Sequence, residues 1–469
     1  MNEKFVKKFN YCKDLYQQKK YKLAFSRTQE LNRKSPKNSH VIFLLSVLAD
    51  SLDKVQYAKS CFEDLLKNDN DLSYKYQYAL FLTKRDFFCE AKKHFQELVR
   101  QSPQTIHYLR DFAQLLLKLG HIKDSEMIFR KALQIDKNDT LSQYSLAIVL
   151  LKLGKLEEGW ALYESRFIHK YISQLIVPIC KQVSEGKIPR WKGQDLTNKT
   201  ILVEDEQGFG DFIQFFRYLK VLKEKFKNIK IILICKEPLI QLVENSKAVD
   251  SVISKNNTNL IDRAQADYFV FLLSIPGYFE KSYEDLKRFF NIPYFIESKE
   301  NKFKNSKLIS NDLINIGIVW RGNSLMSNDK YRSLNNISLL DKFSELKNIN
   351  MLSMQIEDVT DDINKSNLQI HDAGKEISNF QDTLDLIKCV DLVITVDTAA
   401  AHLAGSINKM CFVMLSNISA HWVYRHDNSQ CPWYKNFKVF QQDTSGDWGK
   451  VIESILSEVS KLNKSDFAS

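Results

Sequence analysis

The residues best suited to chemistry lie in the segment 391–405, where an apolar run ends at Asp397 and small side chains follow. The run predicts a buried parallel strand, and the small residues predict the first turn of a helix at its carboxyl end. The free N–H groups and positive dipole end of such a turn favour an anion, and small side chains let a phosphate group come close. An ordinary strand and helix with an aspartate cap is the alternative. The anion-binding interpretation involves Asp397, Thr398, Ala399, Ala400, Ala401 and His402, whose ring can donate to the same anion or to a hydroxyl group.

A second glycine turn lies upstream, between a predicted strand at 200–204 and a predicted helix at 212–225. Gly208 and Gly210 relax this turn and let a ligand approach the backbone. The turn is not a dinucleotide-binding fingerprint, because Ile213 stands where the third glycine of that motif would be. Asp211 follows directly and can cap the helix.

Both turns resemble the nucleotide-sugar site of the heptosyltransferase-like glycosyltransferases, which are two-domain GT-B enzymes. The segments 154–167 and 188–193 are similar to the join between repeats and catalytic domains in bacterial tetratricopeptide glycosyltransferases. The resemblance covers residues 154 to 455 and implies inverting sugar transfer from a nucleotide-sugar donor. It makes Asp211 the general base, because a carboxylate within reach can take the acceptor's hydroxyl proton as the anomeric carbon is attacked. The capping role remains the alternative for Asp211.

The segment after a predicted strand at 315–320 carries further polar positions of these enzymes: a glycine–asparagine turn, an Asn-Asp pair and an Arg-Ser pair. Arginine suits a two-point contact with the leaving diphosphate. Met326 stands where relatives often have histidine, and an exposed basic loop is the alternative interpretation. The resemblance implies donor-side roles for Gly208, Gly210, Arg321, Asn323, Asn328, Asp329, Lys330, Arg332, Ser333 and Gln355.

The segment 420–434 also resembles these enzymes, in which tryptophan, arginine and a Pro-Trp-Tyr run recur. It can close over the nucleotide or the acceptor, or its aromatic side chains can pack the last helix across both domains. Packing is the favoured interpretation.

The first third of the chain is a repeat array. Small residues recur at intervals of 34, 33, 34 and 34, and a second ladder shares the first three intervals. A period near 34 resembles tetratricopeptide (TPR) repeats, which are helix pairs that bury their apolar faces against their neighbours. The array predicts a surface for a peptide or partner protein, with a passive spacer or oligomerisation element as the alternative. The ladders are Ala24, Ala58, Ala91, Ser125 and Gly159, then Pro36, Asn70, Pro103 and Lys137; a large residue follows four positions after the small one at Phe62, Phe95, Phe129 and Tyr163, but not at Thr28.

Composition narrows the class of protein. The 469 residues are 44% hydrophobic and 26% charged, and no apolar run is long enough to span a bilayer. The first residues lack a secretion core, and the eight scattered cysteines form no metal or disulfide pattern, so a cytoplasmic protein without a metal or cofactor is expected. The net charge of +10 is spread along the chain, which argues against nucleic acid and leaves a peripheral membrane contact open.

The predicted fold class is α plus α/β. We expect a TPR solenoid at 1–168, a packed connector at 169–198, a Rossmann-like acceptor-side domain at 199–310 and a nucleotide-sugar-binding domain at 311–469. A glycosyltransferase acting on a protein held by the repeats is the first functional hypothesis. A lipopolysaccharide or polysaccharide acceptor is the second, and a non-catalytic TPR scaffold with a relic GT-B region is the third.

Overall fold

The structure is a computed structural model that describes residues 3–169, 173–174, 176–289, 292–424 and 431–467. It divides into two compact units. The first comprises Met1–Leu117 and Lys123–Asp139, and the second comprises Lys118–Ile122 and Thr140–Ser469.

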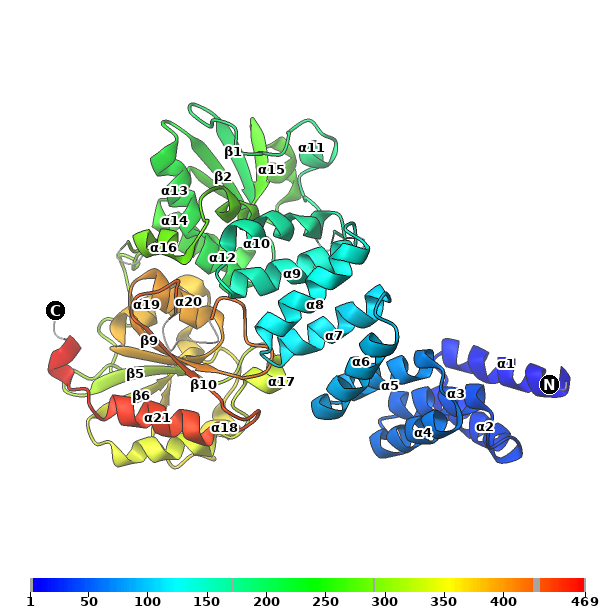
Figure 1. The fold of residues 1–469 in the computed structure, drawn as a ribbon. Coiled ribbons are helices and arrows are strands. Elements are labelled where there is room, and N and C mark those ends of the chain that lie inside the picture. Colours follow the sequence, from blue (N-terminus) through cyan, green and yellow to red (C-terminus); the bar gives the residue numbers. More distant parts are fainter. Residues whose placement is uncertain (1–2, 170–172, 175, 290–291, 425–430, 468–469) are drawn as a thin grey trace. The chain divides into compact units, whose positions relative to one another are not determined.

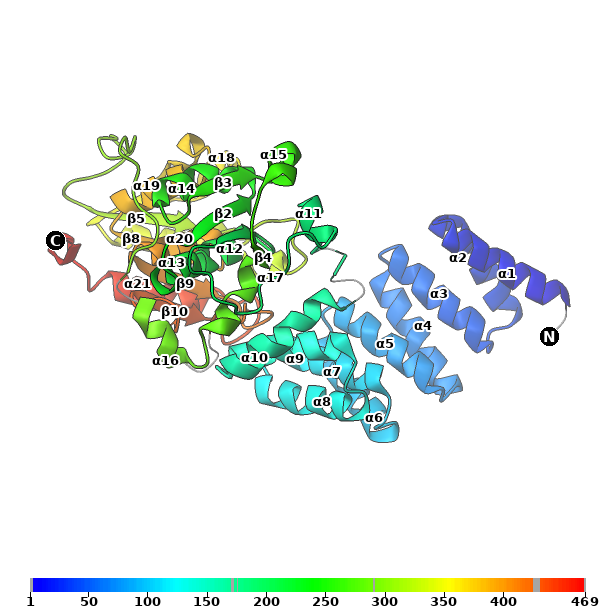
Figure 2. The same cartoon turned by 90° about the horizontal axis from the view of Figure 1, so that it is seen from above.

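The first unit is an array of helix pairs, which follow one another side by side in chain order (Figures 1 and 2). The small residues of the first ladder, from Ala24 to Ser125, are fully buried, and so are the large residues that follow them. Thr28 is buried too, and its hydroxyl donates to the Ala24 carbonyl at 2.8 Å. The prediction of a TPR-like helical repeat is confirmed. Its helices are α1 (Glu3–Gln17), α2 (Tyr21–Lys34), α3 (Ser39–Ser51), α4 (Val55–Asn68), α5 (Leu72–Lys84), α6 (Phe88–Gln101), α7 (Ile106–Lys118) and α8 (Ile122–Ile135).

The turn inside each helix pair has one recurring geometry. A residue with positive φ follows the first helix at Lys19 (58°), Asp53 (57°), Asp86 (65°), Gly120 (77°) and Gly154 (77°). At Lys19 the N–H groups of Lys19 and Lys20 donate back to Tyr16 and Leu15, as in a Schellman motif. Gly120 and Gly154 therefore occupy, in the later repeats, a left-handed turn that the earlier repeats make without glycine.

The long segment of the second unit begins with the last helix pair, α9 (Thr140–Lys152) and α10 (Leu156–Tyr163). Trp160 is 3% exposed and its ring meets those of Phe215 and Trp422 edge-on, each at 5.7 Å between centroids. Gly277 lets the backbone approach this indole, since a Cβ there would lie 3.2 Å from the Trp160 Cβ. The last pair thus shares a core with the α/β region, which is why it belongs to that unit.

The first sheet of the second unit is parallel, in the order β3-β2-β1-β4. Ile201 and Val203 of β1 face helices α12 to α14, and Leu202 faces Ile188 of the connector on the opposite side. The elements are α11 (Lys181–Ser184), β1 (Thr200–Glu204), α12 (Phe209–Phe215), α13 (Arg217–Lys225), β2 (Lys230–Cys235), η2 (Glu237–Leu239), α14 (Ile240–Ser246), β3 (Ser251–Ser254), α15 (Thr258–Arg263), β4 (Tyr268–Phe271), η3 (Leu272–Ser274), η4 (Pro276–Tyr278), α16 (Tyr283–Leu286) and η5 (Lys287–Phe289), with η1 (Glu164–Phe167) before them.

The second sheet is parallel throughout, in the order β10-β9-β8-β5-β6-β7. Val393 of β8 packs with α19 and α20, and its neighbour Ile394 packs with α21 on the other face (Figure 1). The elements are β5 (Ile314–Val319), α17 (Asp329–Arg332), η6 (Ile337–Glu345), β6 (Ile349–Ser353), α18 (Thr360–Ile363), β7 (Ile370–Asp372), η7 (Gly374–Glu376), α19 (Phe380–Cys389), β8 (Leu392–Val396), α20 (Ala399–Ser406), β9 (Met410–Leu415), β10 (Phe437–Gln441), α21 (Gly449–Val459) and η8 (Lys464–Phe467).

Two local predictions are corrected. The helix expected at 212–225 is two helices, with Phe216 between them, and the first begins earlier, at Phe209. The strand β7 was not expected, because its three residues, Ile370–Asp372, form no apolar run. No helix in the described part of the chain is both long and apolar enough to cross a membrane.

Candidate functional site

The two glycine turns meet in the structure. The helix α12 begins after Gly208 at the carboxyl end of β1, and α20 begins after Thr398 at the carboxyl end of β8. Gly210 makes the close approach possible, because a Cβ there would lie 3.0 Å from Cδ2 of His402 and 3.8 Å from Cα of Ala399. The N-terminus of α12, which follows the first sheet, therefore lies beside the N-terminus of α20, which follows a strand of the second sheet. The free N–H groups of these two helix ends make the contact region suited to an anion.

Asp211 has two contacts, one for each carboxylate oxygen. Its Oδ2 accepts a hydrogen bond from the Gly208 N–H at 3.1 Å, and its Oδ1 lies 3.5 Å from Nε2 of His421. The expected capping role is thus present, while the second oxygen faces a histidine. The two side chains remain partly exposed, at 21% for Asp211 and 33% for His421, so a substrate hydroxyl can reach them.

A network built on Asp329 fixes the loop after β5. Asp329 Oδ1 accepts from Arg332 Nε at 3.0 Å and from the Ser333 hydroxyl at 2.8 Å. The Ser333 hydroxyl in turn accepts from the Gly322 N–H at 2.9 Å. Arg332 Nη1 donates to the Asp397 carbonyl at 3.2 Å, which places its cation beside the residue that precedes the N-cap of α20. Gly322 leaves room for this guanidinium, since a Cβ there would lie 2.5 Å from it.

Gln355 holds the same loop from the next strand. It is 3% exposed; its Oε1 accepts from the Arg321 N–H at 2.8 Å, and its Nε2 donates to Glu357 at 2.8 Å. The side chain of Arg321 pairs with Asp362 at 2.9 Å. Of the predicted donor-side residues, Gln355 therefore holds the loop after β5 in place through its hydrogen bonds. Arg321 is already paired with a carboxylate, that of Asp362.

The remaining loop positions are more open. Asn323 is exposed and its Oδ1 accepts from the Leu325 N–H at 2.9 Å, which shapes the turn. Lys330 is exposed, with its ammonium 4.7 Å from the centre of the Tyr331 ring. Asn328 is half-buried and precedes α17.

The anion turn itself is partly open and partly buried. Asp397, Thr398 and Ala399 are half-buried, whereas Ala400 is 8% exposed and Ala401 fully buried. The Thr398 hydroxyl lies 2.9 Å from that of Thr395 and does not cap α20. The N–H groups of Thr398 and Ala399 are therefore the part of the turn best placed for a ligand.

His402 differs from its expected place. The side chain is 4% exposed; its Nδ1 lies 3.0 Å from the Tyr434 hydroxyl, and Gly210 covers its other edge. Burial is the main cause that lowers the pKa of His402 to about 3, and the nearby His421 and Arg217 act in the same direction. The second unit has two α/β lobes, one built on each sheet. The uncharged His402 ring lies in the contact between them, because Gly210 lets α12 pack against it.

Three site neighbours were not predicted. His421 stood in a segment interpreted as packing, and only the fold shows that it faces Asp211. Lys152 is the last residue of α9, and its ammonium donates to the Ala420 carbonyl at 2.8 Å and to the His421 carbonyl at 3.4 Å. Burial lowers the pKa of Lys152 to about 8, although the negative charge of Asp397 acts in the opposite direction. Arg166 is fully buried and makes a two-point ion pair with Glu206, at 3.0 and 2.7 Å, in the loop before Gly208.

Arg166 belongs to the segment that joins the last helix pair to the α/β region. It lies in the segment 154–167, and the indole of Trp160 from the same segment is buried. The described part of the segment 420–434 is also mostly buried, including Trp422, Trp433 and Tyr434, as the packing interpretation expects. Residues 425–430, with Arg425, His426 and Asp427, lie outside the described residues.

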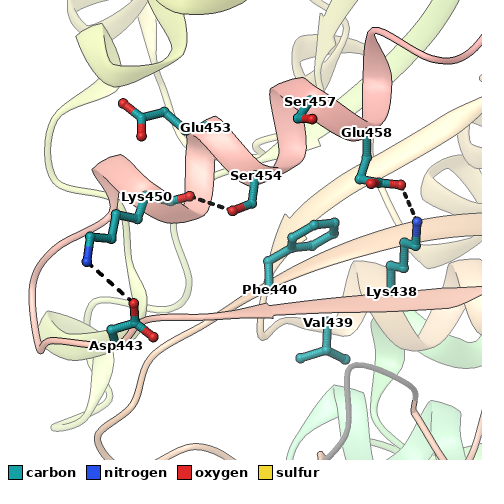
Figure 3. A pocket seen from close by; sticks show the side chains of 9 residues that line it. All are labelled: Lys438, Val439, Phe440, Asp443, Lys450, Glu453, Ser454, Ser457 and Glu458. Atoms are coloured by element: carbon teal, nitrogen blue, oxygen red, sulfur yellow. Dashed lines mark hydrogen bonds and ion pairs between the residues drawn. The ribbon is translucent and has the colours of Figure 1, made fainter.

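A groove of about 640 Å³ lies elsewhere, between β10 and α21 (Figure 3). None of the predicted site residues lines it. Its charged side chains all have partners: Lys438 pairs with Glu458, Lys450 with Asp443 at 3.6 Å, and Glu453 with Lys342 outside the groove at 2.5 Å. Among the described residues, the groove therefore offers no unpaired charge to recognise a ligand. Over the described residues, no group of three His, Cys, Asp or Glu side chains is placed to hold a metal ion.

Comparison with known proteins gives distant similarities. No family model matches the chain. The protein FlbA of Caulobacter vibrioides is 24% identical over 390 residues, which cover 77% of this chain and 63% of FlbA. The chain thus spans less than two thirds of that relative's length.

Solved structures of helical-repeat proteins are also similar to part of the chain. MamA from Desulfovibrio magneticus RS-1 is 14% identical with a TM-score of 0.32, covering 38% of this chain and 97% of that one. PilF of Pseudomonas aeruginosa is 15% identical with a TM-score of 0.31, covering 34% and 74%. YrrB, a TPR protein, is 13% identical with a TM-score of 0.30, covering 34% and 83%.

Proposed function

We propose that this protein is an inverting, metal-independent glycosyltransferase that moves a sugar from a nucleotide-sugar donor to an acceptor. The observation that carries the proposal is the meeting of the N-termini of α12 and α20, with Asp211 at one and Arg332 at the other. A donor diphosphate needs N–H groups and a cation, and an acceptor hydroxyl needs a carboxylate. The proposal assigns both roles to the contact between the N-termini of α12 and α20: Arg332 and the helix N–H groups to the diphosphate, and Asp211 to the hydroxyl.

The strand orders support the same site. Counted within its own lobe, the first sheet runs 3-2-1-4 and the second runs 3-2-1-4-5-6. In doubly wound sheets a nucleotide binds outside the carboxyl ends of the strands, where the order reverses. In the second sheet this point lies between β5 and β8, where Arg332 joins the loop after β5 to Asp397. Two parallel-sheet lobes support the proposal, because a GT-B enzyme needs two Rossmann-like domains.

In the proposed reaction, the acceptor oxygen bonds to the anomeric carbon as the bond from that carbon to the diphosphate oxygen breaks. The hydroxyl proton passes to Asp211, and the electron pair leaves with the nucleoside diphosphate. Attack opposite to the leaving group inverts the anomeric configuration. Arg332 and the N–H groups of Thr398 and Ala399 would stabilise the charge that develops on the leaving oxygen.

The acceptor in this proposal is a protein segment held by the TPR-like array, with a lipopolysaccharide or polysaccharide as the alternative. Arg166 and Glu206 connect the end of the repeat region to the loop that carries Gly208. We propose a cytoplasmic protein that does not bind nucleic acid.

A second candidate is a non-catalytic scaffold, and one observation favours it. Asp211 already caps α12, so a structural role accounts for its presence. A scaffold would bind nucleotides without turnover, whereas the enzyme would release nucleoside diphosphate when the acceptor is added.

The donor site is tested by a charge at the N-cap of α20. Thr398→Asp puts a residue that favours the N-cap position at the start of α20, but it adds a negative charge where the diphosphate would lie, so nucleotide affinity should fall by about 1–3 kcal/mol. Thr398→Asn caps equally well without the charge and should bind normally. Ser454→Asp, on the exposed side of α21, controls for net charge. Calorimetry with a panel of nucleoside diphosphates measures the effect, and equal affinity in Thr398→Asp and Thr398→Asn would remove the diphosphate from this turn.

A further inference from the structure

A small cavity of about 100 Å³ lies beside α13, and none of the residues assigned above to sugar transfer lines it. Three cations line it, Arg217, Lys220 and Arg288, against one carboxylate, Glu224. Its volume has room for several water molecules, and therefore for one small oxyanion. Because cations outnumber carboxylates in its lining, the cavity attracts anions.

Arg217 is the most unusual of these groups. It is 1% exposed, and its guanidinium donates to the carbonyls of Gln214 at 2.9 Å and Trp433 at 3.0 Å and to the Tyr294 hydroxyl at 3.3 Å. All three partners are neutral, and within the described ranges no carboxylate lies within 4 Å of it. A buried charge is normally matched by an opposite charge, because its removal from water is costly.

Aromatic rings compensate this charge in part. The guanidinium carbon lies 4.7 Å from the Tyr434 ring centre, 5.1 Å from that of Tyr294 and 5.3 Å from that of Phe289. Such contacts supply about 0.5–2 kcal/mol each, which is less than a full counter-charge supplies. A guanidinium has five N–H bonds, so these three hydrogen bonds leave it capacity for a further acceptor.

The other two cations can contribute to the same ligand. Lys220 Nζ donates to the Pro293 carbonyl at 2.8 Å, and an ammonium has two further N–H bonds. Arg288 pairs with Glu280 at 2.5 Å through Nη2. The side chain of Arg288 is 43% exposed, which keeps its other N–H groups accessible.

We propose that this cavity binds a small oxyanion, either inorganic phosphate or the terminal phosphate of a small molecule, as the counter-charge of Arg217. The proposal does not depend on sugar transfer. Arg217 lies on α13 of the first lobe, and its Nη1 donates to the Trp433 carbonyl of the second lobe. An anion bound to Arg217 would therefore contact a residue that connects the two lobes. Anion binding should therefore stabilise the second unit.

The test is calorimetric titration of the full chain with inorganic phosphate and with glycerol 3-phosphate, at constant ionic strength set with chloride. We expect binding at millimolar or lower concentrations. Lys220→Gln should weaken it about tenfold, the scale of one lost charge-assisted hydrogen bond. Glu224→Gln removes the one repelling carboxylate and should strengthen binding about threefold, a gain that a purely structural role would not produce. Tighter binding of glycerol 3-phosphate would assign the cavity to a phosphate monoester.

Lys225→Gln is the matched control, because it removes the same charge from the same helix without lining the cavity. It should leave the affinity within about twofold of the parent protein. Equal losses in Lys220→Gln and Lys225→Gln, or no binding at about 10 mM phosphate, would overturn the proposal. Loss of phosphate binding in Thr398→Asp but not in Lys220→Gln would also overturn it, by placing the phosphate at the interlobe turn. The nucleotide affinities of these variants report on the proposed donor site separately.

Discussion

At the scale of single residues, Asp211 carries the proposed chemistry. Asp211→Asn keeps the side-chain shape and caps α12 nearly as well, but it cannot take a proton. Sugar transfer should fall by roughly 10²–10⁴-fold while donor affinity changes little, because that is the usual contribution of general base catalysis. A single-turnover assay beside a melting curve measures both effects.

The capping interpretation predicts a different outcome for the same variant. If Asp211 only caps α12, both stability and transfer would survive in Asp211→Asn. His421→Gln is an informative companion, because its ring faces Oδ1 of Asp211 and not the capping oxygen. A loss of transfer in His421→Gln without a change in melting would show that the pair acts in the reaction.

His402 makes the second unit sensitive to acid. Its pKa of about 3 in the folded chain lies below the value of about 6.5 in an unfolded chain, so the unfolded state binds the proton more readily. The stability that neutral His402 contributes is complete above pH 6.5 and is lost as the pH falls toward 3. Between pH 6 and pH 4 the parent protein should lose about 1.4 kcal/mol per pH unit more than His402→Gln.

Urea unfolding followed by tryptophan fluorescence measures this difference. All six tryptophans lie at position 160 or later, so the signal reports on the second unit. Other groups titrate in both proteins and cancel in the comparison. Parallel loss of stability in the two proteins would mean that His402 does not carry the acid sensitivity.

At the scale of elements, the left-handed turns of the repeats offer a stability test. Lys19 has φ of 58° after α1, a conformation that glycine adopts without a steric cost. Lys19→Gly should therefore stabilise the first helix pair by about 0.5–1 kcal/mol, seen as slower hydrogen exchange in α1 and α2. Lys22→Gly makes the same substitution inside α2 and should destabilise it by about 1 kcal/mol. Equal changes in both variants would argue against the turn as the cause.

The elements were largely predictable, and the contacts between them were not. The strand predicted at 200–204 has the bounds of β1, and the one predicted at 315–320 lies one residue later than β5, because a buried parallel strand leaves a continuous apolar signal. The repeat ladder was readable because its small residues must be buried in every pair. Strand β7 was missed because three residues leave no such signal.

Site contacts depend on distances across the fold, which a single sequence does not contain. His421 is 210 positions from Asp211 and Lys152 is 268 positions from Ala420 along the chain, and only packing brings each pair together. The burial of His402 likewise follows from the closeness of Gly210 to α20, and not from the local sequence. The positions of the glycines and charges in the turns can be read in the sequence, but their contact partners can be found only in the fold.

At the scale of the whole molecule, the repeats should select the acceptor and leave the donor site intact. Removing residues 1–105 deletes the helix pairs before α7 and retains the segments of the second unit. Because repeat stability rests on neighbouring pairs, the remaining chain should fold and bind donor nucleotide, while transfer to the natural acceptor falls. Full transfer by a well-folded truncated chain would show that the deleted repeats do not choose the acceptor.

The central claim is that this protein transfers a sugar. The direct measurement is intact-mass spectrometry of candidate acceptors after incubation with the full chain and a panel of nucleotide sugars, with Asp211→Asn as the matched control. We expect a mass increase of one sugar residue, together with free nucleoside diphosphate, in the parent reaction and a far smaller increase with Asp211→Asn. Nucleotide binding without any mass increase across the panel would contradict the claim and favour a scaffold.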